Sequence, residues 1–517
     1  MRLRQMLVSI GTAGFAALVV SEAATAQRGG VPVFADGVAS GDVTASSAIL
    51  WTRVDRDTSV KVEVWSNPRL LGKKAFQRTF PRVSAAHDFT VKVDATELAP
   101  DTTYYYRFKH DDVDGSSVSE VGTFRTAPAA GAASDLRFTY TGDADGTRRP
   151  GGAPAYNQFE VLDAARLEDG AFWVFDGDTI YADSSFRAAP AVTLAEYQAA
   201  HRENRGYANL RELLAATSVY ATMDDHEVVN DYTAADVDPA RYAAGRQAFL
   251  DYYPVRDTNL PHDPSCAGDP LYRRFRWGSE VEVFLLDERS CRSASAVTVC
   301  AGDLGPTLPT AVRSDFPFIL FLPPEPPPGC LATIFDPART LLGPVQKARF
   351  FADLAASTAT WKLVVSEEPV QQFHALPYDR FEGYAAERNE LLALIRDQGI
   401  AGVKFLTPDT HATLLNQVAI DRFAAPDPIA VELVTGPVAT NTFETEVRAI
   451  AGEFGLTVFN QLLTFDGLDC RNLNRNSYAL VEVDAGAGTI ALSSRDESGA
   501  LVVDPETAAQ CTLTDGP

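Results

Sequence analysis

The chain has 517 residues, of which 46% are hydrophobic and 22% are charged, and its formal net charge is −24. A chain of this length exceeds what one hydrophobic core usually serves, so we expect at least two domains. The apolar content excludes a disordered protein, and the strong negative charge argues against nucleic-acid binding because it repels phosphate backbones.

Residues 1–26 have the pattern of a signal peptide. A basic start, MRLRQ, precedes the apolar run MLVSIGTAGFAALVV, and Ala24-Thr25-Ala26 fits the small-residue cleavage pattern. A membrane anchor is the alternative, but the run is short for a span of about 20 residues. We therefore expect cleavage near Gln27, a secreted or periplasmic protein, and no integral membrane segment in the mature chain.

Residues 33–127 predict an all-β domain. The segments SAILWTRV, VKVEVWS, FTVKVDA and TYYYRFKH alternate apolar and polar residues, with turn residues between them. The stretch LAPDTTYYYRF resembles the tyrosine corner of fibronectin-type and immunoglobulin-like sandwiches. Residues 126–134, TAPAAGAAS, contain small residues and proline without periodicity, which indicates a linker.

Residues 135–517 predict an α/β domain. Apolar strands such as AFWVF, VEVFLL, WKLVV and GVKFL alternate with helical stretches such as YNQFEVLDAARLED and AAERNELLALIRDQGI. This alternation is typical of a largely buried sheet covered by helices. Ligands in such folds bind beyond the carboxyl ends of the strands, so the residues that follow each strand are the candidates for a site.

Acidic residues follow several of these strands. The endings GDAD, FDGDTIYAD, MDDHEVVND and TPDTH supply Asp143, Asp178, Asp225 and Asp409, and LLDER and VVSEE add further acids. A lone Asp-Gly pair is a common turn. Carboxylates that converge at one edge raise each other's pKa unless a cation neutralises them, so we hypothesise a centre of several metal ions.

The ligand types narrow the choice of metal. Carboxylate and amide oxygens suit Ca²⁺, Mg²⁺ or Mn²⁺, and a chain with seven histidines disfavours a histidine-rich zinc site. The phenolate of Tyr181 would suit Fe³⁺, although an aromatic packing role is the alternative. His226 and His411 each lie within two residues of an acid, which favours ligation or acid catalysis over a local structural role.

The six cysteines suggest disulfides because their number is even and the chain carries an export signal. The sequence alone does not choose among the possible pairings. Cys291, Cys300 and Cys330 crowd a proline-rich stretch, so we expect a stapled surface insertion at about residues 291–335. A binding role for this stretch is the alternative.

Several motifs together resemble the PhoD-like family, which comprises alkaline phosphatase D and its phosphodiesterase relatives. In chain order these motifs are GVASGDVTASSAILWTRV, GDTIYAD, DDHEVVND, YYPVR, LGPVQKARFFADLAASTATWKLVVSEEPV, FEGYAAERNEL and TPDTH. The resemblance implies a calcineurin-like metallophosphatase αββα sandwich behind an all-β amino-terminal domain. It also implies Fe³⁺ together with Ca²⁺ as cofactors.

The same resemblance implies the roles of individual residues. Asp178 would bridge metals, Tyr181 would bind iron, and Asn230 and Arg256 would face the phosphate. The expected metal ligands are Asp143, Asp178, Tyr181, Asp225, Asn230, Asp409 and His411. The expected catalytic residues are His226, Asn230 and Arg256. For His226, protonation of the leaving group and orientation of a ligand both remain open.

The sequence departs from the family pattern at the first strand. The family usually has an iron-binding cysteine where this chain has Gly142-Asp143. A carboxylate is a harder ligand than a thiolate, so Mg²⁺, Mn²⁺ or Zn²⁺ becomes an alternative to iron. Pro408 and Phe381-Glu382 also differ from the family residues, but they leave the expected ligands in place.

These features predict a metal-dependent hydrolase that cleaves a small phosphoester with a hydroxide formed from a metal-acidified water. The chain has no G-x-S-x-G elbow and no P-loop, which gives no support to serine hydrolase or nucleoside-triphosphatase chemistry. Two alternatives are a phospholipase D-type enzyme on the same core and an exported binding protein without catalysis. The intact ligand set argues against the second alternative.

Overall fold

The computed structural model describes residues 33–112, 115–257, 260–316, 319, 321–375 and 377–516. The expected signal peptide, residues 1–26, lies outside the described residues. Among the helices of the described part, none is long and apolar enough to span a lipid bilayer.

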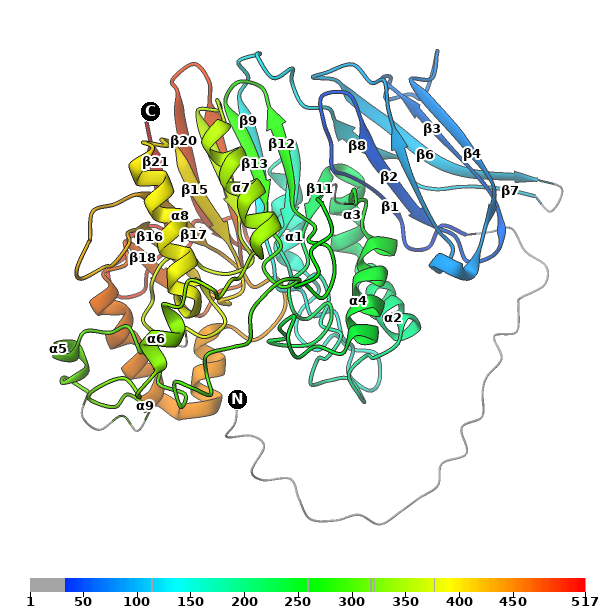
Figure 1. Ribbon diagram of the computed structural model, residues 1–517. Helices are drawn as coiled ribbons and strands as arrows, with labels where there is room; N and C mark the ends of the chain where they lie inside the picture. The colour runs from blue at the N-terminus through cyan, green and yellow to red at the C-terminus, as the bar shows by residue number, and fades with distance from the viewer. Residues whose placement is uncertain are drawn as a thin grey trace, which may run out of the picture.

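Two β-sheets packed face to face form the centre of the molecule (Figure 1). The nine-stranded sheet has the order β21 (Thr512–Asp515), β20 (Thr489–Asp496), β19 (Ser477–Asp484), β9 (Leu136–Thr141), β10 (Phe172–Phe175), β11 (Ser218–Ala221), β1 (Val38–Gly41), β2 (Ala48–Arg53), β5 (Thr90–Ala95). The seven-stranded sheet has the order β12 (Arg273–Trp277), β13 (Val281–Leu285), β14 (Trp361–Val365), β15 (Val403–Thr407), β17 (Ala430–Val434), β16 (Thr413–Val418), β18 (Cys470–Asn472).

The central strands of both sheets are parallel. β9, β10, β11 and β1 run in one direction in the first sheet, and β13, β14, β15 and β17 do so in the second. In β10, Phe172 and Val174 join the core between the sheets, whereas Trp173 and Phe175 join the core under the outer helices. Burial on both faces explains why β10, with the sequence FWVF, is continuously apolar.

Helices cover the outer face of each sheet, which completes the predicted αββα sandwich. Helices α1, α3 and α4 cover the nine-stranded sheet and α2 packs on α4, while α7 and α8 cover the seven-stranded sheet (Figure 1). Their bounds are α1 (Glu160–Leu167), α2 (Leu194–Arg205), α3 (Ala208–Ala216), α4 (Pro239–Tyr252), α7 (Pro344–Ala356) and α8 (Ala385–Asp397), with the 3-10 helix η3 (Phe381–Tyr384) before α8.

Three further helices gather at the lower left of Figure 1, below the seven-stranded sheet. They are α5 (Thr310–Arg313), α6 (Cys330–Ile334) and α9 (Phe443–Asp466). The first two belong to the expected proline-rich insertion, which a disulfide between Cys300 and Cys330 closes. The other cysteines are also paired, Cys266 with Cys291 and Cys470 with Cys511, so the prediction of disulfides is confirmed.

The amino-terminal strands form a β-sandwich, as the alternating pattern predicted. A separate five-stranded sheet packs against β1, β2 and β5. Its strands are β4 (Phe76–Val83), β3 (Thr58–Trp65), β6 (Thr103–Asp112) and β7 (Gly115–Val118), with β8 (Gly122–Arg125) beside β6. The short 3-10 helix η2 (Ala85–His87) lies between β4 and β5. The hydroxyl of Tyr104 accepts a hydrogen bond from the backbone N–H of Ala99 at 2.9 Å, which is the geometry of a tyrosine corner.

The sandwich and the α/β core share one sheet. Strand β1 pairs in parallel with β11, so β1, β2 and β5 extend the nine-stranded sheet of the core. The domain bounds of 33–127 and 135–517 stay a prediction.

Candidate metal centre

Four of the expected metal ligands follow strands and share an unusual backbone conformation. Asp143 follows β9, Asp178 follows β10, and Asp409 and His411 follow β15, with φ angles of 65°, 49°, 58° and 55°. These values lie in the left-handed region, which side-chain-bearing residues seldom adopt and which often occurs at functional sites. The turns bring the four side chains to the carboxyl edge of the sheets.

A first group consists of Asp143, Asp178 and His411, which each place one ligand atom within 4.8 Å of the others. The hydroxyl oxygen of Tyr181 lies 3.0 Å from Nε2 of His411. Among the described residues, neither carboxylate oxygen of the buried Asp143 has a hydrogen-bond partner. An orphaned buried carboxylate is costly unless a cation neutralises it, so this donor set fits a metal ion.

A second group consists of Asp178, Asp225 and His226 and shares Asp178 with the first. The Nε2 atom of His226 lies 4.0 Å from Oδ2 of Asp178 and 4.0 Å from Oδ1 of Asp225. The ring of Tyr181 stacks on the imidazole of His226 with centroids 4.0 Å apart. Asp178 therefore belongs to both groups, and its expected role as a bridge between metals stays a prediction.

Arginine side chains neutralise two further acidic groups. One of these groups consists of Asp224, Glu368 and Asp409. The other consists of Asp225, Asp231 and Asp379. The buried guanidinium of Arg289 contacts Asp224, lies 2.5 Å from Glu368 and lies 2.7 Å from Asp379. Arg292 adds a contact to Asp379 and lies 2.7 Å from Glu368. The guanidinium groups supply positive charge here, so a metal ion is needed less than in the first two groups.

Burial dominates the electrostatics of the candidate ligands. It raises the pKa of Asp143 to about 8 and the pKa of Asp409 to about 7, and it raises the pKa of Asp178 well above its ordinary value. Burial lowers the pKa of His411, but the neighbouring carboxylates of Glu446, Asp143 and Asp409 together outweigh this, and the pKa rises to about 9. A cation that binds these ligands must displace the protons that they hold without it.

Arg256 contacts residues outside the two groups, and its expected role toward the phosphate stays a prediction. Its guanidinium donates to Oδ1 of Asp94 at 3.0 Å and to Oγ of Ser47 at 2.9 Å, and its backbone N–H donates to Asp42 at 2.5 Å. Residues 253–256 lead from the end of α4 to the amino-terminal strands, so Arg256 joins the two parts of the chain.

Two other expected ligands lie at the edge of these groups. Asp409 belongs with Asp224 and Glu368 rather than with the first group. The backbone N–H of Asn230 donates to Oδ2 of Asp183 at 2.8 Å, which places its loop beside His226. Metal ligation by Asp409 and by the Asn230 side chain stays a prediction.

The sequence reasoning missed several residues that surround the groups. Asp183 had a signal, because it ends the motif FDGDTIYAD. Arg289 directly follows Glu288 in the motif LLDER, and Arg292 lies three residues further on. Other missed residues had no local signal, because they come from a loop and from the start of α9; these are Asp379 and Glu446.

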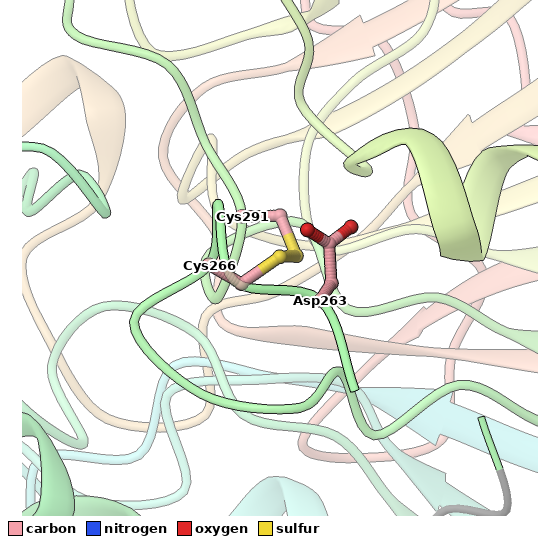
Figure 2. A group of neighbouring side chains, drawn as sticks. All are labelled: Asp263, Cys266 and Cys291. Carbon is pink, nitrogen blue, oxygen red and sulfur yellow. A yellow bond between two sulfur atoms is a disulfide. The ribbon is translucent and has the colours of Figure 1, made fainter. Parts of the chain in front are cut away.

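One more group with metal-ligand spacing is not a metal site. Asp263 lies beside Cys266 and Cys291, as Figure 2 shows. The two sulfur atoms form a disulfide, so neither can act as the thiolate that binds a metal.

Comparison with known sequences identifies the family to which the chain is similar. Residues 151–489 match the PhoD-like phosphatase family, and residues 20–128 match the PhoD-like phosphatase N-terminal domain. The chain is 29% identical over 422 residues to alkaline phosphatase D of Bacillus subtilis (strain 168), which covers 75% of this chain and 66% of that protein. The chain therefore spans just under two thirds of the length of that relative.

Comparison with solved structures agrees with the fold. A structure of PhoD superposes with a TM-score of 0.72 at 23% identity, over 94% of this chain and 91% of that one. The purple acid phosphatase PPD1 from yellow lupin seeds superposes with a TM-score of 0.56 at 11% identity, over 94% of this chain and 74% of that one. The fold is that of a metallophosphatase. The chain belongs to the PhoD-like phosphatase family.

Proposed function

We propose that the protein is an exported, metal-dependent hydrolase of small phosphoesters. The observation that carries this proposal is the pair of carboxylate–histidine groups that share Asp178. The family match and the name of the Bacillus subtilis relative, alkaline phosphatase D, support the same reaction class.

The first ion would be held by Asp143, Asp178 and His411, with the hydroxyl of Tyr181 beside them. The second would be held by Asp178, Asp225 and His226. Oxygen donors dominate both positions, which suits hard cations. We propose Fe³⁺ with Ca²⁺ from the family resemblance, and Mg²⁺, Mn²⁺ or Zn²⁺ as the alternatives that the carboxylate of Asp143 allows.

When bound, such ions neutralise phosphate oxygens and lower the pKa of a water. The residues around them position the ligands. Oδ1 of Asp183 lies 2.5 Å from Nδ1 of His226, and because an ionised carboxylate can only accept, Nδ1 is the donor. The other ring nitrogen, Nε2, faces Asp178 and Asp225. We therefore assign His226 to ligand binding rather than to protonation of the leaving group.

The net charge of −24 affects which groups can bind the substrate. A phosphoester anion would be repelled by the surface as a whole, so cations at the site have to supply the attraction. Arg289 and Arg292 are already paired with carboxylates, and Arg256 is paired with Asp94. Metal ions are therefore the proposed source of positive charge for phosphate.

One observation favours phospholipid diesters as a second candidate substrate. Helix α9 starts beside the proposed metal ligand His411, because the backbone N–H of Phe443 donates to the carbonyl oxygen of His411 at 2.9 Å. Further along the same helix Ile450 and Phe454 are 71% and 60% exposed. Hydrolysis of a short-chain phosphatidylcholine above and below its critical micelle concentration tests this candidate. If phospholipids are the substrate, the rate should be higher on micelles than on monomers.

Chelation tests the proposed reaction. Hydrolysis of p-nitrophenyl phosphate and of bis-p-nitrophenyl phosphate should be lost after treatment with a chelator and restored by the ion that elemental analysis finds. Full activity of metal-free protein would refute the mechanism. The ratio of the two rates separates a monoesterase from a diesterase.

Export is part of the proposal. The three disulfides suit an oxidising compartment outside the cytoplasm. Amino-terminal sequencing of the protein recovered from the culture medium or the periplasm should give a start near Gln27. Recovery in the cytoplasm with Met1 intact would contradict export.

A further inference from the structure

A short segment between β17 and α9 contacts two candidate ligands of the first group. The backbone N–H of Ala439 donates to the carbonyl oxygen of Asp143 at 2.9 Å, and that of Phe443 donates to the carbonyl oxygen of His411 at 2.9 Å. A Cβ atom on Gly436 would lie 2.5 Å from Oδ2 of Asp143, so the segment starts in close contact with this carboxylate. Residues 436–446 therefore form a bracket around the first group, which we call the α9 bracket.

The last residue of the α9 bracket contacts the side chain of His411. Oε1 of Glu446 lies 3.4 Å from Nδ1 of His411. The other ring nitrogen, Nε2, lies 3.0 Å from the hydroxyl oxygen of Tyr181 and 3.8 Å from Oδ1 of Asp143. One nitrogen thus faces a carboxylate outside the group, and the other faces the candidate metal position.

This arrangement is the one in which a carboxylate orients a metal-binding histidine. A carboxylate that accepts a hydrogen bond from Nδ1 fixes the tautomer, and the lone pair of Nε2 then remains for a metal ion. Partners of this kind typically change metal affinity by about 10- to 100-fold when they are removed.

We propose that Glu446 is a positioning residue for His411 and that it couples ion binding in the first group to the docking of the first turn of α9. This inference rests on the proposed metal centre. Because such coupling is reciprocal, an ion that needs His411 in this orientation also stabilises the turn that supplies Glu446. The segment with the exposed Ile450 and Phe454 continues directly from that turn.

The same helical turn offers a matched control. Glu444 is also an acid of the first turn, but its Oε1 accepts hydrogen bonds from Arg448 at 3.0 Å and from Asn474 at 3.3 Å. The side chain of Glu446 is 40% exposed, so its truncation does not empty a core. Substitutions at the two positions change the charge and helix propensity of α9 equally.

The first measurement is ion affinity of the full-length protein by competition with a chelator, using the ion that elemental analysis finds in the wild type. Glu446→Ala should weaken binding by about 10- to 100-fold. Glu446→Gln should recover part of this loss because an amide oxygen still accepts a hydrogen bond from Nδ1. Glu444→Ala should bind like the wild type. Equal affinity of Glu446→Ala and Glu444→Ala would overturn the inference.

The second measurement is hydrogen exchange of the first turn of α9 with and without the ion. The wild type and Glu444→Ala should show slower exchange when the ion is added, and Glu446→Ala should lose most of that protection. Ion-dependent protection that persists in Glu446→Ala would contradict the coupling. If the wild type binds no ion, the proposed function itself is refuted. If Glu446→Ala binds the ion as tightly as the wild type does, only this inference is refuted.

Discussion

Asp183 and His226 form a hydrogen-bonded pair, with Oδ1 of Asp183 2.5 Å from Nδ1 of His226. The other oxygen of the same carboxylate accepts a hydrogen bond from the backbone N–H of Asn230 at 2.8 Å. One acid outside the two candidate metal-binding groups therefore fixes both the ring of a candidate ligand and the loop that follows it.

Substitution of Asp183 by asparagine should impair the site without removing a ligand. The amide can present either an oxygen or an NH₂ group to Nδ1, so the ring of His226 loses its fixed tautomer. We expect kcat/KM on p-nitrophenyl phosphate to fall by about 10- to 100-fold. Asp163→Asn is the control. Within the described residues, the one ion pair of Asp163 is with Arg166, at 2.5 Å. Equal rates for the two variants would contradict the role of Asp183.

Arg289 should be among the residues on which stability depends most. Its buried guanidinium contacts Asp224, Glu368 and Asp379, which would be left without that partner in Arg289→Gln. Removing one partner of a buried ion pair typically lowers the free energy of unfolding by about 3–5 kcal/mol. Urea unfolding measures this change directly.

The surface variant Arg349→Gln provides the comparison for this measurement. Arg349 is 53% exposed and pairs with Asp353 at 2.8 Å. Because Asp353 keeps its contacts with Tyr272 and Arg274 when Arg349 is replaced, we expect a smaller loss of stability than in Arg289→Gln. If Arg289→Gln unfolds at the same urea concentration as Arg349→Gln, the buried cluster does not depend on its guanidinium.

The disulfide between Cys266 and Cys291 should matter for the site as well as for the fold. Cys291 lies between Arg289 and Arg292 in the chain, so the disulfide shown in Figure 2 fixes the segment that carries both arginines. Loss of a native disulfide typically costs about 2–5 kcal/mol. We expect the double serine variant to lose ion affinity in addition to stability.

A second disulfide separates these two effects. Cys470 and Cys511 join β18 to the residue before β21, and a double serine variant at this position should lose stability but keep its ion affinity. Ion affinities measured by chelator competition would contradict the expectation if they fell equally in the two variants.

The stability of the ion-free protein should depend on Asp143 in a defined direction. Burial raises the pKa of Asp143 from 3.8 to about 8, so between these values the folded chain retains a proton that the unfolded chain releases. This carboxyl therefore destabilises the ion-free fold progressively as the pH rises from about 4 to about 8. Asp143→Asn removes the effect.

Thermal unfolding in the presence of a chelator measures this dependence. The Tm of Asp143→Asn should exceed that of the wild type at pH 8, and the difference should shrink toward pH 5. With a saturating ion the order should reverse, because the ion stabilises only the chain that keeps the ligand. A difference between the ion-free proteins that grows as the pH falls would contradict the predicted sign.

Much of the fold and part of the site follow from local sequence. The alternation of apolar strands and helices predicts an α/β domain with a largely buried sheet, whereas the αββα arrangement is what the family resemblance implies. Asp143, Asp178 and His411 are predictable because the ends of parallel strands meet at one edge, whatever the length of chain between them. Their convergence in the structure agrees with that reasoning.

Other parts depend on contacts that local sequence does not encode. Arg256 lies in a motif that resembles the family pattern, yet its guanidinium bonds to Asp94, which is distant in the chain. The pairing of β1 with β11 also requires the tertiary fold. Helix α9 contains Gly452 in a non-helical conformation, so its apolar periodicity is interrupted and Glu446 gave no sign of a place beside His411.

The number of ions bound by wild type and by Asp178→Ala tests the central claim most directly. Asp178 belongs to both carboxylate–histidine groups, so elemental analysis of the purified wild type should find at least two ions per chain, and the variant should lose both together with phosphoester hydrolysis. An Asp178→Ala protein that folds, keeps its full ion content and retains the wild-type rate would contradict a shared, bridging carboxylate.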